Sequence, residues 1–273
     1  DRVGSTDAHT SLASTRDENY WGKFAGTEPA PDRYEHYVLK SASGDESIST
    51  FAWEEVASGL AAVWARENTR EALFEAMQRK ETYATTGTRI LVRFFGGWEY
   101  GADEVFLPDA AAIGYRKGVP MGGDLPSRPA DKTAPVFMVG ALKDPWSGNL
   151  DRIQIVKGWV DENGDRHEKI YDVAVSDGRA IGSDGSCKTP VGNTVDEKNA
   201  TYLNTIGDAE LRAMWTDPDF NPKHRAVYYA RVMEIPTPTW QAYDAKFFGI
   251  EMPDYVPLSH QERAYTSPIW FTP

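Results

Sequence analysis

Cysteine, positive charge and long apolar runs are scarce in this sequence, and each shortage excludes a class of protein. The one cysteine, Cys187, cannot form a disulfide within the chain, so we expect an inert or loop-exposed thiol, or else a bridge to another chain. The 29 Lys and Arg residues against 41 Asp and Glu give a net charge of -12, which repels a phosphate backbone and an anionic membrane surface. No apolar run approaches the roughly 20 residues of a membrane-spanning helix. We therefore expect no nucleic-acid partner and no membrane insertion.

Several motifs that mark well-known active sites are also missing. The sequence has no G-x-S-x-G elbow, Walker loop, G-x-G-x-x-G, paired Cys-x-x-Cys or H-E-x-x-H. Chemistry that uses a nucleophilic serine or cysteine therefore has no support. His36, His167, His224 and His260 stand at no recognisable ligand spacing, so we expect each of them to be solvated or structurally hydrogen-bonded.

The residues that are present predict a folded chain of one or two domains. Hydrophobic residues make up 41% of the 273 positions and aromatic residues 12%, which suits a sizeable core. The apolar run 59–65 predicts a strand. Asn68 followed by Glu71 has the form of a capping box, which predicts a helix that starts at Asn68. The face of this helix expected to meet the core carries Leu73, Ala76, Met77 and Lys80.

After Gly87 the sequence turns to short runs rich in β-branched and aromatic residues, which predict strands. Asn163-Gly164 lies between two of these runs and supplies the positive φ angles of a hairpin. The alternation of apolar and polar residues predicts antiparallel sheets in a β-sandwich. The Gly- and Pro-rich segment 118–135 predicts a crossing loop. The predicted strands are RILVRFFGGW, APVFMVGAL, LDRIQIVKGWV, HEKIYDVAV and HRAVYYARVMEI.

Asp7 and His9 form an acidic and histidine pair whose spacing suggests a metal site. On an extended backbone, residues i and i+2 project from the same face, so the two side chains can converge on one ion. A carboxylate and a neutral imidazole suit Zn, Mn or Fe. A complete site needs three or four protein ligands, and Asp-x-His also arises by chance, so the pair alone leaves a metal site open.

Several longer stretches resemble a large, mostly bacterial family of uncharacterised function. That family is similar to a distant branch of the polymerase-and-histidinol-phosphatase (PHP) superfamily of metal-dependent hydrolases. The similarity covers nearly all 273 residues. The stretches that carry it are GSTDAHTS, NYWGKF, TREALFEAMQRKETYATTGTRILVRFFGGW, GVPMGGDLP, ALKDPWSGNLDRIQIVKGW, PVGNTVD and QERAYTSPIWFTP.

The resemblance implies a fold in two parts. Residues 1–86 would be the C-terminal portion of a distorted β/α barrel, with the strand and helix between Gly59 and Lys80 as its last unit. Residues 87–273 would form the β-sandwich that follows. Of the family's metal ligands, only the final Asp-x-His motif is present here, as Asp7 and His9. The earlier ligands are expected in an N-terminal chain or segment of the same precursor, which we expect to remain bound as a partner.

The function implied by the resemblance is metal-dependent hydrolysis, most often of phosphoesters. Two or three ions of Zn, Mn or Fe would activate water in the complete site. Lys23 is expected to hold an anionic group of a small-molecule substrate and Trp21 to stack on it, although both residues also suit packing. The alternatives are carbamate, amide or other ester hydrolysis, or a non-catalytic β-sandwich module for binding or assembly. Members of the family often carry secretion signals, which suggests a periplasmic or secreted bacterial protein.

Overall fold

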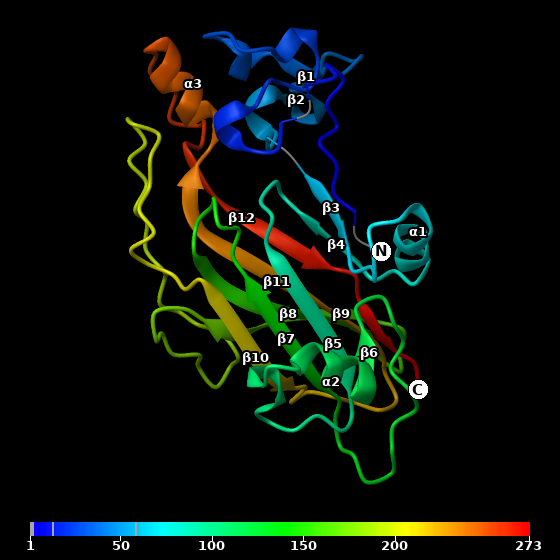
Figure 1. Cartoon of the computed structure of the whole chain (residues 1–273). Coiled ribbons are helices and arrows are strands. Elements are labelled where there is room, and N and C mark those ends of the chain that lie inside the picture. Colours follow the sequence, from blue (N-terminus) through cyan, green and yellow to red (C-terminus); the bar gives the residue numbers. More distant parts are fainter. Residues whose placement is uncertain (1–2, 13, 58) are drawn as a thin grey trace.

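Two antiparallel sheets form the body of the molecule in the computed structural model, which describes residues 3–12, 14–57 and 59–273 (Figure 1). The large sheet has the strand order β3-β4-β12-β11-β8-β9, and β13 pairs with β11. The small sheet has the order β10-β7-β5-β6. The strands of the large sheet are β3 (Leu60–Val63), β4 (Thr82–Thr85), β8 (Leu150–Val160), β9 (Arg166–Val175), β11 (Arg225–Pro238), β12 (Ser259–Thr266) and β13 (Ile269–Phe271). Those of the small sheet are β5 (Leu91–Gly97), β6 (Gly118–Pro120), β7 (Val136–Leu142) and β10 (Glu210–Thr216).

The two sheets share one core, because each strand alternates apolar and polar residues and so has one buried face. Phe94 of β5 and Phe137 of β7 stack with ring centroids 5.5 Å apart. The Tyr228 ring of β11 lies 4.4 Å from that of Phe137. Ile153 and Ile155 of β8 are fully buried in the same cluster. Burying each such side chain contributes roughly 1.5–3 kcal/mol. The five predicted strands are confirmed, and they form mostly antiparallel sheets.

The region expected to be the last unit of a barrel is arranged differently. Strand β3 pairs antiparallel with β4, and β4 pairs with β12. Strands of a β/α barrel are parallel. The segments on either side of residue 86 therefore share one sheet, and no closed barrel is found within residues 3–12, 14–57 and 59–273.

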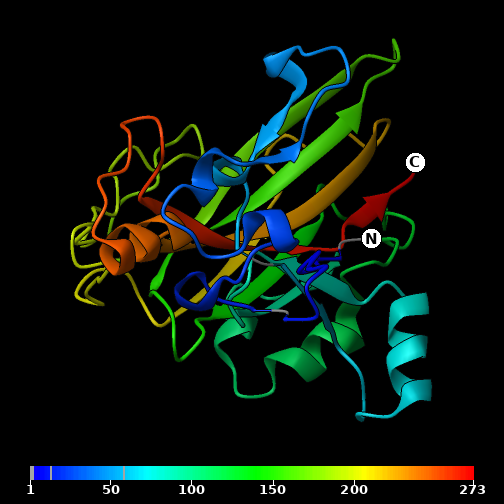
Figure 2. The same cartoon turned by 90° about the horizontal axis from the view of Figure 1, so that it is seen from above.

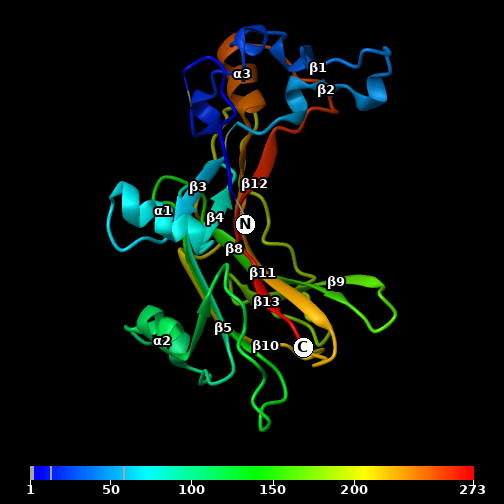
Figure 3. The same ribbon diagram turned by 90° about the vertical axis from the view of Figure 1, so that its right-hand side faces the viewer.

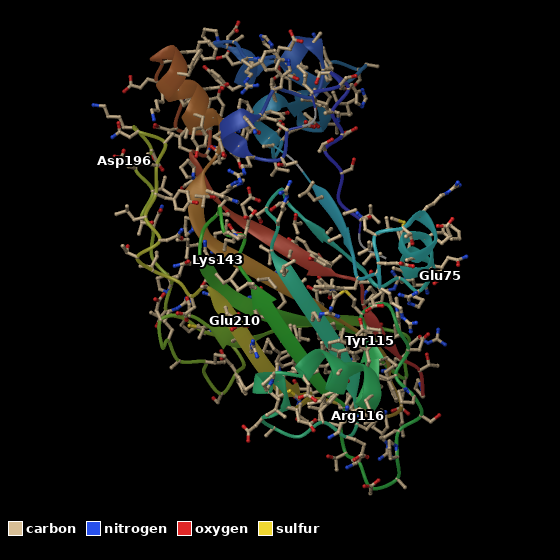
Figure 4. All side chains as sticks on the ribbon, in the orientation of Figure 1. Glu75, Tyr115, Arg116, Lys143, Asp196 and Glu210 are labelled. Atoms are coloured by element: carbon tan, nitrogen blue, oxygen red, sulfur yellow. The ribbon has the colours of Figure 1, made fainter. Side chains whose placement is uncertain are left out.

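Helix α1 (Arg70–Gln78) begins later than the capping box predicted. Its N-cap is Thr69, whose side chain accepts a hydrogen bond from the backbone N–H of Ala72. Thr69 takes this role because its hydroxyl oxygen reaches the backbone N–H of Ala72 when the helix starts at Arg70. Ala76 is fully buried, but Phe74 and Met77 remain more than half exposed. Helix α1 lies at the edge of the molecule, where Glu75 is labelled (Figure 4).

Helices α1 and α2 (Ala110–Lys117) lie on the same side of the sheets (Figure 2). None of the helices in the part of the chain that the structure describes is long and apolar enough to cross a membrane.

A cap, made of residues 14–57 and helix α3 (Trp240–Phe248), sits above one end of the sheets (Figure 3). Tyr20 packs on the indole of Trp240 within a small separate core. The remaining cap elements are short: β1 (Tyr37–Leu39), β2 (Thr50–Phe51) and the 3-10 helices η1 (Asp17–Asn19), η2 (Ala25–Thr27), η3 (Arg33–Glu35), η4 (Glu46–Ile48) and η5 (Ala52–Glu54). One further 3-10 helix, η6 (Glu104–Phe106), lies outside the cap.

The predicted hairpin between β8 and β9 is confirmed, with one difference in its turn. Of the two turn residues Asn163 and Gly164, only Gly164 takes a positive φ, of 88°. The carboxylate of Asp161 accepts hydrogen bonds from the backbone N–H groups of Asn163 and Asp165. This local bonding closes the five-residue connection 161–165 without a second left-handed residue.

The crossing segment 118–135 is tied down by the end of the chain. It begins as β6, which pairs with β5. Beyond β6, Gly122 donates its backbone N–H to Pro268 and Leu125 donates to Trp270. Cys187 is buried instead of loop-exposed, and its thiol donates to the carbonyl oxygen of Thr189.

Candidate functional site

Asp7 and His9 meet at the surface, as their spacing predicted. His9 Nε2 lies 3.1 Å from Asp7 Oδ1, and about three fifths of each side chain is exposed. The backbone is not the extended one that we expected, because Asp7 has a left-handed φ of 48°. The His9 N–H donates to the carbonyl oxygen of Lys23 at 2.7 Å, which holds the two segments side by side.

Lys23 joins this pair directly. Its Nζ lies 2.6 Å from Asp7 Oδ2 and 3.7 Å from Glu55 Oε1. The hydrogen bond from Lys23 lowers the pKa of the Asp7 carboxyl below its usual range, with a smaller contribution from His9. The Asp7 carboxylate in turn raises the pKa of Lys23. Lys23 therefore holds an anionic group already, and that group is the predicted metal ligand.

A glycine places Lys23 in this position. Gly22 has a φ of 113°, and a Cβ there would lie 2.2 Å from the carbonyl oxygen of Thr27. Only glycine fits such a conformation without strain. The preceding residue, Trp21, remains 41% exposed, and its backbone N–H donates to Ser14 Oγ. Trp21 thus lies near Lys23 in the chain and is accessible to a ligand.

An open groove of about 470 Å³ lies beside Asp7. Glu54 and Glu55 of the cap contribute further carboxylates to its walls, and Thr86, next to β4, also lines it. Carboxylates on the walls repel an anionic substrate unless cations balance them. No sequence pattern indicates that Glu54 and Glu55 lie here, because both reach the groove through the folding of the cap.

Residues 2–273 match the family model described as "Protein of unknown function (DUF3604)". The chain belongs to this family. No curated protein and no solved structure matches the chain.

Three of the remaining histidines of this DUF3604 protein have the structural contacts that we predicted. His36 bonds the carbonyl oxygen of Gly26, His167 lies 2.9 Å from an Asp161 oxygen, and His224 contacts Asn221.

The fourth histidine is different. His260 is largely buried between the carboxylates of Asp17 and Glu262. Burial lowers the pKa of His260, but the two carboxylates outweigh it and raise the pKa to about 10. The sequence shows only the i and i+2 spacing of His260 and Glu262 on β12, because Asp17 comes from the cap and joins them through folding.

Proposed function

We propose that this protein contributes Asp7 and His9 to the active site of a metal-dependent hydrolase that acts on phosphoesters. The observation that carries the proposal is that Asp7 contacts both His9 and Lys23 and also lines a groove. A carboxylate and an imidazole whose donor atoms lie 3.1 Å apart have the spacing of two ligands of a single ion.

The donor set fits a divalent metal ion in type but is incomplete in number. Asp7 offers an oxygen and His9 a nitrogen, which suit Zn, Mn or Fe. Such a site needs three or four protein ligands for each ion, and the proposed complete site holds two or three ions. We therefore propose that an N-terminal chain or segment of the same precursor supplies the other ligands, together with the remainder of a PHP-like barrel.

Lys23 has two roles in this proposal. In the absence of a metal its ammonium group neutralises Asp7, at a distance of 2.6 Å. When a metal ion replaces this contact, Lys23 is free to hold a phosphate oxygen of a small-molecule substrate. Trp21 is exposed two positions earlier and would stack on the substrate's organic group.

A bound metal ion would supply an activated water for hydrolysis. The protein's own contribution is to offset the charge of the groove. Glu54 and Glu55 would repel a phosphate there, so catalysis on an anionic substrate requires both the metal charge and Lys23.

His9→Ala tests the proposal in the complete protein with any chain that copurifies with it. We expect loss of bound metal and a decrease of at least about 100-fold in the rate of bis(p-nitrophenyl) phosphate hydrolysis, because the substitution removes one of the metal's direct ligands. His36→Ala is the matched control, because His36 is also a partly exposed histidine of the N-terminal region but lies outside this pair. Unchanged metal content and hydrolysis in His9→Ala would contradict the proposal and favour a non-catalytic binding module.

The class of substrate is tested separately on the wild-type protein. Bis(p-nitrophenyl) phosphate, p-nitrophenyl acetate and p-nitroacetanilide share a coloured product but differ in the bond that is cleaved. Preference for the phosphodiester supports the proposal. Preference for the acetate or the anilide would assign the protein to ester or amide hydrolysis by the same superfamily.

A further inference from the structure

A second group of metal-ligand side chains lies inside the molecule, away from the Asp7 pair. Asp17, His260 and Glu262 each offer one ligand atom, and these atoms all lie within 4.8 Å of one another. His260 Nε2 is 3.3 Å from Asp17 Oδ2 and 3.2 Å from Glu262 Oε1. Ligands bound at about 2.1 Å in a tetrahedral site are about 3.4 Å apart. The two contacts that include the imidazole already have this spacing.

These contacts are not ordinary hydrogen bonds. His260 Nε2 is buried and has no hydrogen-bond partner of acceptable direction among the described residues. The second oxygen of each carboxylate, the one turned away from His260, accepts a hydrogen bond from another residue. Asp17 Oδ1 accepts the backbone N–H of Trp240 at 2.8 Å, and Glu262 Oε2 accepts the hydroxyl of Thr86. Partners of this kind orient metal ligands in known sites.

A small cavity of about 40 Å³ adjoins this group, with Asp17, Glu262, Ser147 and Thr88 in its walls. A volume of this size holds one ion or one water molecule. Glu234 of β11 is fully buried, and one of its oxygens accepts a hydrogen bond from Ser147 Oγ. Its other oxygen, Oε1, has no hydrogen-bond partner among residues 3–12, 14–57 and 59–273.

Glu234 lies on the strand next to that of Glu262. The pairing of β11 with β12 is irregular between Met233 and Pro236, opposite Glu262. Glu234 and Glu262 therefore face the same interior on adjacent strands. Burial raises the pKa of Glu234 to about 8, and the negative charge of Glu262 adds to the effect.

His260, whose pKa is raised, carries one positive charge here, but Asp17, Glu262 and Asp144 together bring more negative charge. Asp144, only 4% exposed, adds a further carboxylate to the cavity wall. Arg16 also lines the cavity, but its guanidinium pairs with Glu18. Lys143, labelled in Figure 4, donates hydrogen bonds from its ammonium group to the backbone carbonyl oxygens of Asp144 and Ser147. Buried carboxylates without a matching cation cost several kcal/mol each, which favours the uptake of a cation.

We propose that Asp17, His260 and Glu262 bind a divalent transition-metal ion, with Glu234 as a further donor through a bound water molecule. Mixed nitrogen and oxygen ligands favour Zn²⁺ or Mn²⁺ over Ca²⁺ and Mg²⁺. The ion joins the cap, through Asp17, to β12 of the large sheet, and it stabilises the position of the cap that carries Lys23. This site is separate from the proposed hydrolase site, and the proposal does not rest on the proposed function.

Zinc binding by the chelator-treated chain tests the proposal. Calorimetric titration with ZnCl₂ at pH 7 is expected to show a site with a Kd below about 1 μM, and CoCl₂ is expected to give the intense visible bands of a four-coordinate ion. In His260→Gln the affinity falls at least about 100-fold, and in Glu234→Gln about 10-fold. Zinc also raises the melting temperature of the wild type but not that of His260→Gln.

The double variant Asp7→Asn/His9→Gln is the matched control. It removes the ligands of the proposed hydrolase site and should keep the buried zinc site and its cobalt spectrum. Wild-type chain that binds no zinc with a Kd below about 100 μM, or His260→Gln that binds zinc as tightly as the wild type, would overturn the proposal. If His260→Gln does not fold, Glu262→Gln decides: an unchanged cobalt spectrum overturns the assignment, and a loss of the bands supports it.

Discussion

Arg33 and Asp244 stand 211 positions apart in the chain and form a bidentate ion pair in the interior. Arg33 is only 2% exposed, and its guanidinium lies 4.5 Å from the ring centre of Trp240. It also donates to the carbonyl oxygens of Tyr20 and Thr27. Arg33 thus fastens residues 14–57 of the cap to helix α3.

Arg33→Met is expected to destabilise the protein by about 3–5 kcal/mol, because it leaves the buried Asp244 carboxylate without a partner. Urea unfolding followed by circular dichroism measures the change. Arg16→Met is the matched control, since Arg16 pairs with Glu18 at the surface, where such pairs contribute at most about 1 kcal/mol. Equal effects of the two substitutions would contradict the central role of Arg33.

Lys23→Met is expected to raise the pKa of Asp7 toward its ordinary value, because the bond from Lys23 is the largest effect that lowers it. NMR titration of the labelled Asp7 carboxyl carbon measures the shift. Glu55→Gln should leave this pKa almost unchanged, since Lys23 remains 2.6 Å from Asp7 Oδ2. An unshifted Asp7 in Lys23→Met would mean that the two residues do not pair in solution.

Tyr83→Phe is expected to change how stability depends on alkaline pH. Burial raises the pKa of Tyr83 to about 12 in the folded chain, from 10.0 in the unfolded chain. The tyrosine's contribution is therefore fully present below pH 10 and is lost between pH 10 and 12, by about 1.4 kcal/mol per pH unit. Its hydroxyl also donates to the carbonyl oxygen of Ile90, a bond that contributes about 1 kcal/mol. At pH 8 the variant should thus have a lower free energy of unfolding than the wild type. By pH 11.5 its free energy of unfolding should approach or exceed that of the wild type.

Urea unfolding at several pH values measures this convergence. Tyr255→Phe serves as the control, because Tyr255 is 56% exposed and the variant should follow the wild type at every pH. If the free energies of unfolding of Tyr83→Phe and the wild type differ by the same amount at every pH, the pKa of Tyr83 is not raised in the folded protein.

Gly122→Ala is expected to destabilise the protein more than Gly164→Ala. Both glycines have a φ close to 90°, so alanine is strained by about 1 kcal/mol at either position. At Gly122 a Cβ would also lie 2.3 Å from the carbonyl oxygen of Lys80, whereas nothing lies within 4 Å at Gly164. We expect a loss of at least about 2 kcal/mol for Gly122→Ala in urea unfolding. Equal losses would show that the segment after β6 moves to accept a side chain.

The sequence determined the local structure of this protein well where the pattern is regular. The alternation in LDRIQIVKGWV predicts β8 because a strand has a period of two residues, and this strand is present as Leu150–Val160. Helix α3 and strand β10 were not predicted. The moderately apolar segment Trp240–Phe248 forms a helix that packs against residues 14–57 of the cap, so tertiary contacts decide its structure.

The two candidate sites also differ in how far the sequence predicted them. The spacing of Asp7 and His9 predicted that they meet, since residues two apart remain close even with the left-handed φ of Asp7. Their role as metal ligands stays a prediction. Nothing in the sequence connects Asp17 with His260 and Glu262, because the docking of the cap on the sheet brings them together. Sequence alone determined the strands that have a regular apolar alternation, and the tertiary structure decided which charges share an interior, because strand pairing and cap docking depend on contacts between distant parts of the chain.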